Sequence, residues 1–155
     1  MAISLPALSH CRRVLFNRLL SSTATRRADP WLLPNTPEHI AQTTSPNNAP
    51  PPEPLPRPGE AVETMRARLV YQARKRGTLE SDLVLSTFAK ERLGEMDEAE
   101  LREFDKLMDE PDWDIYYWAT GKKTPPERWA DSKLLEKLRV HVRNEGRAVR
   151  RMPDL

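Results

Sequence analysis

Cysteine, glycine and histidine are scarce in this chain. Its 155 residues include one cysteine (Cys11), five glycines and three histidines. A single cysteine cannot form an internal disulfide or build a thiolate metal site alone. Five glycines are too few for the glycine-rich loops that hold nucleotide phosphates. The composition therefore argues against disulfide-stabilised, metal-binding and nucleotide-binding proteins.

Long hydrophobic runs are also missing, and acidic residues are absent from the N-terminus. No stretch approaches the roughly 20 consecutive apolar residues of a membrane-spanning helix, so we expect no membrane insertion. Residues 1–28 contain five arginines, several serines and threonines, and no acid. Leucines among these arginines can form an amphipathic helix, which is typical of a mitochondrial transit peptide. We interpret residues 1–28 as such a peptide, with a disordered basic arm as the alternative.

The basic charge of the chain comes from this N-terminal segment. Without its five arginines, 20 basic residues face 23 acidic ones, which leaves a net charge of −3. The charge of the remaining body therefore gives no support to a nucleic-acid partner.

Proline dominates the next segment, residues 29–60, which holds ten of the 15 prolines. Proline lacks a backbone donor and fixes φ, so such a run disfavours helices and central strands. We expect a disordered linker here. A polyproline ligand for an SH3-like domain is a weaker alternative.

Residues 61–148 carry helical patterns throughout and no strand alternation. The prediction is an all-α fold, a small bundle of about five short helices, followed by a flexible basic tail at 149–155. The expected helices are residues 61–76, residues from Thr78 to about 93, residues from Asp97 to about 110, residues 112–119, and a fifth that begins at Thr124 and runs to about 142.

Local signals mark several helix starts. Asp97 followed by Glu100 is a variant of the capping box. Asp112 is expected to cap the fourth helix, and Thr124 followed by Pro125 the fifth. Leu79 is assigned to the apolar surface of the second helix.

No catalytic group stands out in the predicted domain. Of the three histidines only His141 lies in it, and one histidine without neighbouring ligands makes no zinc site. We interpret His141 as a partly exposed helix residue. The 13 acids from Glu80 to Asp114 are expected to supply helix starts and solvated faces, although they could include an acid/base pair. We therefore predict no catalytic, cofactor-binding or metal-binding residue.

The aromatic run from Trp113 to Trp118 has two interpretations. In the first, Trp113 and Tyr117 pack in the core while Tyr116 and Asp114 face water. In the second, exposed tyrosine and tryptophan form a protein-binding hot spot. The first is favoured for most of these residues, because a small bundle needs large side chains.

One turn carries the most specific pattern. Arg76-Gly77-Thr78-Leu79-Glu80 follows two cationic residues, Arg74 and Lys75. The local pattern is a helix stop, a tight turn and a negatively charged helix start. The missing side chain of Gly77 lets another backbone approach closely.

Further segments follow this turn in order: Asp82-Leu83, Phe88-Ala89-Lys90-Glu91, Phe104-Asp105-Lys106-Leu107-Met108-Asp109-Glu110-Pro111 and Asp112-Trp113-Asp114-Ile115-Tyr116-Tyr117-Trp118-Ala119-Thr120-Gly121. Their order and spacing over residues 62–145 resemble the succinate dehydrogenase assembly factor 2 family. This family promotes covalent attachment of FAD to the flavoprotein subunit of succinate dehydrogenase, complex II.

The resemblance implies a five-helix fold, a mitochondrial matrix location and a non-enzymatic role. It implies binding to that flavoprotein subunit through Arg76, Gly77 and Glu80, with Arg74 and Lys75 as neighbouring residues. The factor would hold no cofactor stably and would act on the FAD of its partner. It would be a monomer when free.

Three other functions stay open at this point. They are a mitochondrial ribosome- or RNA-associated helical protein, a small enzyme that uses the acidic middle, and an accessory subunit that stays in a complex. Salt-dependent RNA binding, turnover without a partner, or permanent co-purification would favour each in turn.

Overall fold

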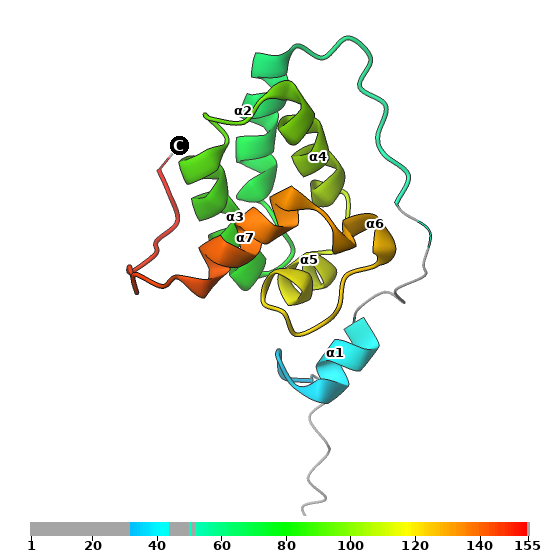
Figure 1. Ribbon diagram of the computed structural model, residues 1–155, viewed down its shortest axis with the longest axis vertical. Helices are drawn as coiled ribbons and strands as arrows, with labels where there is room; N and C mark the ends of the chain where they lie inside the picture. Colours follow the sequence, from blue (N-terminus) through cyan, green and yellow to red (C-terminus); the bar gives the residue numbers. More distant parts are fainter. Residues whose placement is uncertain (1–31, 44–49, 51, 155) are drawn as a thin grey trace, which may run out of the picture. The chain divides into compact units, whose positions relative to one another are not determined.

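The computed structural model describes residues 32–43, 50 and 52–154, and all of its regular secondary structure is helical (Figure 1). The all-α fold class is confirmed. The described residues form seven helices, α1 Pro37–Thr43, α2 Val62–Ala73, α3 Leu79–Arg92, α4 Glu98–Met108, α5 Asp112–Ala119, α6 Glu127–Ala130 and α7 Lys133–Arg143. The predicted transit peptide lies outside the described residues.

Side-chain caps explain where three of these helices begin. Thr78 accepts a hydrogen bond from the Ser81 backbone amide at the start of α3. Asp97 accepts one from the Glu100 amide, at 2.8 Å, at the start of α4. Each cap satisfies an amide that would otherwise lack a partner in the first helical turn. The capping signal at Asp97 is therefore confirmed.

The predicted fifth helix is divided into two, α6 and α7. Pro126 precedes α6 without a side-chain cap, so the predicted cap at Thr124 is wrong. The cause is the pair Pro125-Pro126, because a proline restricts the preceding residue to extended backbone. Ser132 then caps α7 by accepting from the Leu135 amide at 3.0 Å.

Helix α1 lies inside the segment for which we expected a disordered linker. Pro37 occupies its first position, where a missing amide costs nothing, and the Thr36 hydroxyl accepts from the His39 amide at 3.3 Å. After Pro37, the next proline in the sequence is Pro46. A local gap in the proline spacing is thus enough for one short helix.

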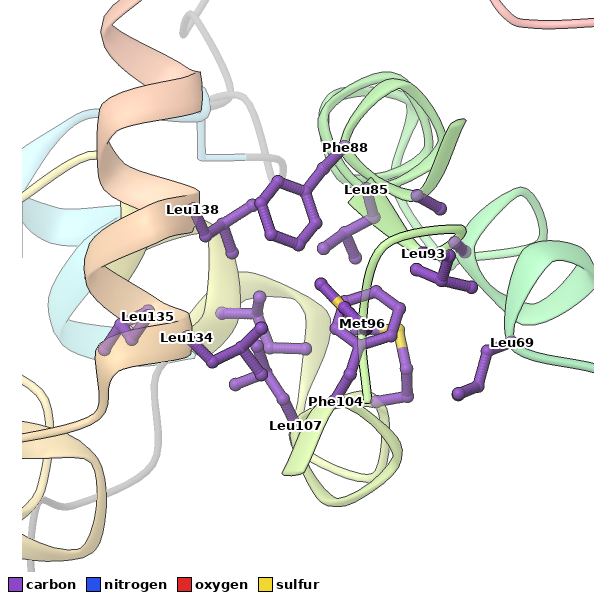
Figure 2. Packing of buried hydrophobic residues seen from close by; sticks show 14 of the residues in the cluster. Leu69, Leu85, Phe88, Leu93, Met96, Phe104, Leu107, Leu134, Leu135 and Leu138 are labelled. Carbon is purple, nitrogen blue, oxygen red and sulfur yellow. The ribbon is translucent and has the colours of Figure 1, made fainter. Parts of the chain in front are cut away.

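The core gathers side chains from α2, α3, α4, α5 and α7. Phe88 from α3, Phe104 from α4 and Leu138 from α7 are fully buried around a common centre (Figure 2). The two phenylalanine rings lie 5.8 Å apart, centre to centre. Burying such large apolar side chains is the main driving force for the fold. This core holds α3 and α5 in place, and the candidate site lies where these two helices meet.

A charged cluster fastens the chain before α2 to the bundle. Arg68 on α2 forms ion pairs with Glu60 and with Asp105 on α4, both at 2.6 Å. Arg57 also pairs with Asp105, at 3.2 Å. Hydrogen bonding to Arg68 holds the pKa of Glu60 below its ordinary value.

Candidate functional site: the turn between α2 and α3

Five residues, Arg74 to Thr78, connect α2 to α3. The turn is fixed at its far side by Asp82 in the first turn of α3. The Asp82 carboxylate accepts from the Arg76 backbone amide at 2.5 Å. A carboxylate at this position also interacts favourably with the positive end of the helix dipole. The predicted helix stop, turn and acidic helix start are therefore all present.

The Arg76 side chain points inward to the junction of α4 and α5. Its Nε donates to Asp112 at 2.5 Å, and the ion pair is mostly buried, with the two side chains 12% and 18% exposed. Its two other nitrogens donate to the Met108 carbonyl at 2.9 Å and the Glu110 carbonyl at 3.2 Å. The guanidinium thus binds the last carbonyl of α4, a carbonyl of the connection between α4 and α5, and the first residue of α5.

Gly77 is approached closely by the same carboxylate. Its amide donates to Asp112 Oδ2 at 2.5 Å, and a Cβ added at Gly77 would lie 2.8 Å from that oxygen. That distance is shorter than any normal carbon–oxygen contact. We expected a close approach to Gly77 by another backbone. In the free chain the close neighbour is a side chain of the same protein.

The structure gives Asp112 a different role from the one that the sequence indicated. We expected it to cap α5, but α5 begins at Asp112 itself, after Pro111, with no side-chain cap. Its carboxylate is instead shared between Arg76 and Gly77. The two partners lie about 35 residues earlier in the chain, so no local pattern could have indicated the contact.

Arg74 is held by the C-terminal tail, because its guanidinium donates to the Pro153 carbonyl. The neighbouring Lys75 is exposed. The predicted set therefore lies close together, with Arg74, Arg76 and Gly77 on the turn and Glu80 in the first turn of α3, but its members differ in what they contact.

Leu79 and Glu80, the first two residues of α3, form what is called here the outer side of the turn. Leu79 is 82% exposed, so the prediction that it belongs to a buried apolar surface is wrong. As the first residue of α3, it lies beyond the packed part of that helix. Glu80 is partly exposed and lies near Tyr116 of α5. Burial raises the pKa of Tyr116, and the negative charge of Glu80 adds to the increase.

The aromatic run in α5 is divided between core and surface. Tyr117 and Trp118 are buried, while Trp113 and Tyr116 are partly exposed. Trp113 stacks on Tyr117, with the ring centres 5.5 Å apart. Asp114, expected to face water, is fully buried, and its charge acts on Arg128. Buried charges in proteins are paired, so Asp114 belongs to the packed interior.

His141 is buried, which corrects the expectation of a partly exposed residue. Its ring nitrogens lie 2.9 Å from the Thr87 hydroxyl and 3.1 Å from the Glu91 carboxylate, both on α3. Burial lowers the pKa of His141 below its ordinary value. The Thr87 hydroxyl also donates to the Leu83 carbonyl at 2.7 Å, which ties it to its own helix. These contacts of His141 connect α7 to α3.

The described part of the chain has neither a candidate metal site nor a candidate membrane span. Residues 32–43, 50 and 52–154 contain no cluster of three histidine, cysteine or acidic side chains arranged for a metal ion. No helix within those same ranges has both the length and the apolar character needed to span a bilayer.

Comparison with known proteins gives one consistent family. Residues 67–142 match the family described as "Flavinator of succinate dehydrogenase". This matched range includes the turn, Asp112 and the aromatic run.

Several curated relatives carry the name "Succinate dehydrogenase assembly factor 2, mitochondrial". The protein from Cryptococcus neoformans is 55% identical over 133 residues, which cover 83% of this chain and 76% of the relative. The protein from Yarrowia lipolytica is 60% identical over 106 residues, which cover 66% and 73%. The protein from Saccharomyces cerevisiae is 51% identical over 105 residues, which cover 66% and 65%.

Proposed function

Because this chain belongs to the mitochondrial succinate dehydrogenase assembly factor 2 family, we propose that it binds the flavoprotein subunit of that enzyme and promotes covalent attachment of FAD. The members of the family are named as assembly factors, so the chain is not an enzyme. We place its action in the mitochondrial matrix. The free protein is a monomer, binds no FAD stably and acts on the FAD of its partner.

The observation that carries this proposal is the family match over the α2–α3 turn. The turn has a rigid inner side, where Arg76 and Asp112 are paired, and an outer side that presents Leu79 and Glu80. A rigid frame lowers the conformational entropy lost when a surface binds a partner. An exposed leucine beside a carboxylate offers both an apolar contact and a hydrogen-bond acceptor.

The mechanism requires no catalytic group in this protein. Attachment of FAD to a histidine of the flavoprotein needs the flavin, the imidazole and charge-stabilising groups in alignment. Those groups can all belong to the partner. Holding the partner in the competent conformation is itself worth several kcal/mol, because alignment removes entropy from the barrier.

The test is covalent flavin fluorescence of the flavoprotein on a denaturing gel, after incubation with FAD in the presence or absence of this protein. We expect a clear gain when the protein is present. No gain, together with no detectable complex between the two proteins, would contradict the proposal.

Glu80→Ala and Leu79→Ala test the outer side of the turn. Each is expected to weaken flavoprotein binding by about 1–2 kcal/mol, the typical loss for a contributing interface residue. The free energy of unfolding should stay nearly unchanged, since Leu79 is 82% exposed and Glu80 is partly exposed.

The matched control is Glu98→Ala, which removes another first-turn acid at the start of α4. Glu98 lies beyond the opposite end of the 14-residue helix α3. Normal affinity in both turn variants would mean that the partner binds elsewhere. A loss in Glu98→Ala would mean that the assay reports overall charge.

Gly77→Arg combines two effects. We expect it to abolish flavoprotein binding while most of the helix content remains. The added side chain would also displace Asp112 from the Gly77 amide. Circular dichroism should therefore accompany the binding measurement, and normal binding by this variant would contradict the assignment of the turn.

A further inference from the structure

The aromatic face of α5 is covered by a segment that precedes the folded domain. His39 of α1 is buried, and its ring meets Trp113 edge to face, with the ring centres 4.6 Å apart. The His39 ring also lies 6.1 Å from the ring of Tyr117. Helix α1 thus covers a face that, in the bundle alone, would be open.

The Tyr117 hydroxyl organises this contact. It lies 2.6 Å from His39 Nδ1, and it accepts a hydrogen bond from the Asn35 backbone amide at 3.2 Å. The hydroxyl hydrogen is then free to be donated to His39. Lys122 Nζ adds a bond to Asn35 Oδ1 at 2.6 Å. The cover therefore matches specific polar groups on α5 and its following turn.

The same contact is small enough to be reversible. Helix α1 has seven residues, and His39 is the one buried residue among them. Glu38, Ala41, Gln42 and Thr43 are exposed. A helix of this length is not stable in water by itself. An element with so few buried contacts belongs to the part of a protein that opens at low free energy.

The covered face adjoins the outer side of the α2–α3 turn. The first residue of α5, Asp112, is bonded to Gly77, and Tyr116 lies near Glu80. Trp113 packs against Tyr116 with the ring centres 5.8 Å apart, and His39 packs on the same Trp113. The surface therefore runs from Glu80 through two aromatic rings to α1.

We propose that the α5 face beneath α1 is part of the flavoprotein-binding surface, and that α1 occupies it in the free protein as a displaceable cover. The inference rests on the proposed function, since it extends the surface assigned there. Partly exposed tryptophan and tyrosine beside a leucine and a carboxylate are typical of binding hot spots. The cover shields these rings until the partner displaces it.

The first variant removes the anchor from the cover. In full-length His39→Ala, hydrogen exchange in residues 40–43 should accelerate, because α1 loses its one buried side chain. Flavoprotein affinity should rise by about 3- to 10-fold, since the binding-competent open state becomes the dominant one. Gln42→Ala, at an exposed position of α1, is the matched control and should change neither quantity.

The second variant strengthens the cover. Asn35 has φ +70°, a conformation that aspartate also tolerates. Asn35→Asp converts its bond with Lys122 into an ion pair. Exchange in residues 40–43 should slow, and flavoprotein affinity should fall by up to about 3-fold, the modest effect of an exposed ion pair.

Each other outcome overturns the inference. Weaker binding by His39→Ala would make α1 part of the interface and not a cover. Unchanged affinity with faster exchange would place the partner away from this face. Unchanged exchange would mean that His39 is not the anchor. If the unmodified protein fails to bind the flavoprotein, the proposed function itself fails, and the exchange data still report whether α1 is held by His39.

Discussion

The two ends of α3 are built from the same kinds of residue and are held differently. At its beginning, Arg76 donates to backbone carbonyls and Gly77 lies in the turn. Beyond its end, Arg66 donates to the carbonyls of Leu93 and Met96, and Gly94 lies in the turn. Only the first end also has a mostly buried carboxylate, Asp112, which binds both the arginine and the glycine.

This carboxylate changes what each residue does. A Cβ at Gly77 would lie 2.8 Å from Asp112, whereas a Cβ at Gly94 would meet nothing within 4 Å. Neither glycine has the positive φ that other residues avoid. Space, and not backbone conformation, therefore separates the two glycines. The lesson is that a glycine after a helix can be required by a residue far away in the sequence.

The largest expected effect comes from removing the arginines. Arg76→Ala should lower the free energy of unfolding by about 2–4 kcal/mol, because it leaves a mostly buried carboxylate without its ion pair. Arg66→Ala should lower it by about 1–2 kcal/mol, since the ion-pair partner of Arg66, Glu63, is largely exposed and 3.7 Å away. Urea unfolding of both variants measures the difference. Equal losses would remove the distinction between the two ends.

Replacing the two glycines should give a smaller difference in stability, and again the variant at the beginning of α3 should lose more. Gly77→Ala should destabilise the fold by about 1–2 kcal/mol, because Asp112 must move and lose a charge-assisted hydrogen bond. Gly94→Ala should be neutral or slightly stabilising. Alanine lowers the conformational entropy of the unfolded chain, and its Cβ would meet no atom within 4 Å in the folded protein. Thermal unfolding of these two variants and the unmodified protein measures both changes. A tolerated alanine at Gly77 would show that the carboxylate relocates easily.

The smallest expected effect is a pH dependence of stability that arises from His141, which lies against the second half of α3. Burial lowers the pKa of His141 in the folded state from an ordinary value of 6.5. The unfolded state therefore binds the proton first as pH falls, and the neutral histidine contributes stability that is fully present above about pH 6.5. Stability should decrease below that pH and level off once the folded-state pKa is passed.

Urea unfolding at pH 7.5 and pH 5.5, compared between the unmodified protein and His141→Gln, isolates this contribution. The glutamine variant should show the weaker pH dependence. An equal dependence in both would assign the loss of stability to the carboxylates.

Local sequence signals predicted the helices well where one residue type determines the start. Asp97 caps the helix that follows it, as expected, and α3 begins after Thr78, near the predicted start. The predicted helix boundaries were wrong where one local signal favours a helix and a neighbouring one opposes it. The pair Pro125-Pro126 prevented the expected start at Thr124, and an uninterrupted stretch after Pro37 allowed a helix in the proline-rich segment.

The sequence predicted where the residues of the candidate site lie along the chain, but only part of what they contact. The sequence placed Arg74, Arg76 and Gly77 at a helix end and turn, and Glu80 at the start of the next helix, and the structure agrees. It could not show that Arg76 and Gly77 face Asp112, since that contact joins segments about 35 residues apart. The same limit applies to His39, whose partners Trp113 and Tyr117 lie more than 70 residues away.

The sequence by itself determined the helical periodicity, the cap at Asp97 and the family, because each depends on residues close together or on an ordered set of motifs. Only the tertiary structure decided which of those residues face inward. Helix packing determines which side chains are buried and which distant residues pair. In this protein the long-range contacts of Arg76, Gly77 and His39 all involve residues of α5. Because of this packing, Asp112 binds Arg76 and Gly77 and does not cap α5. For the same reason His39, from the proline-rich segment, is buried against Tyr117.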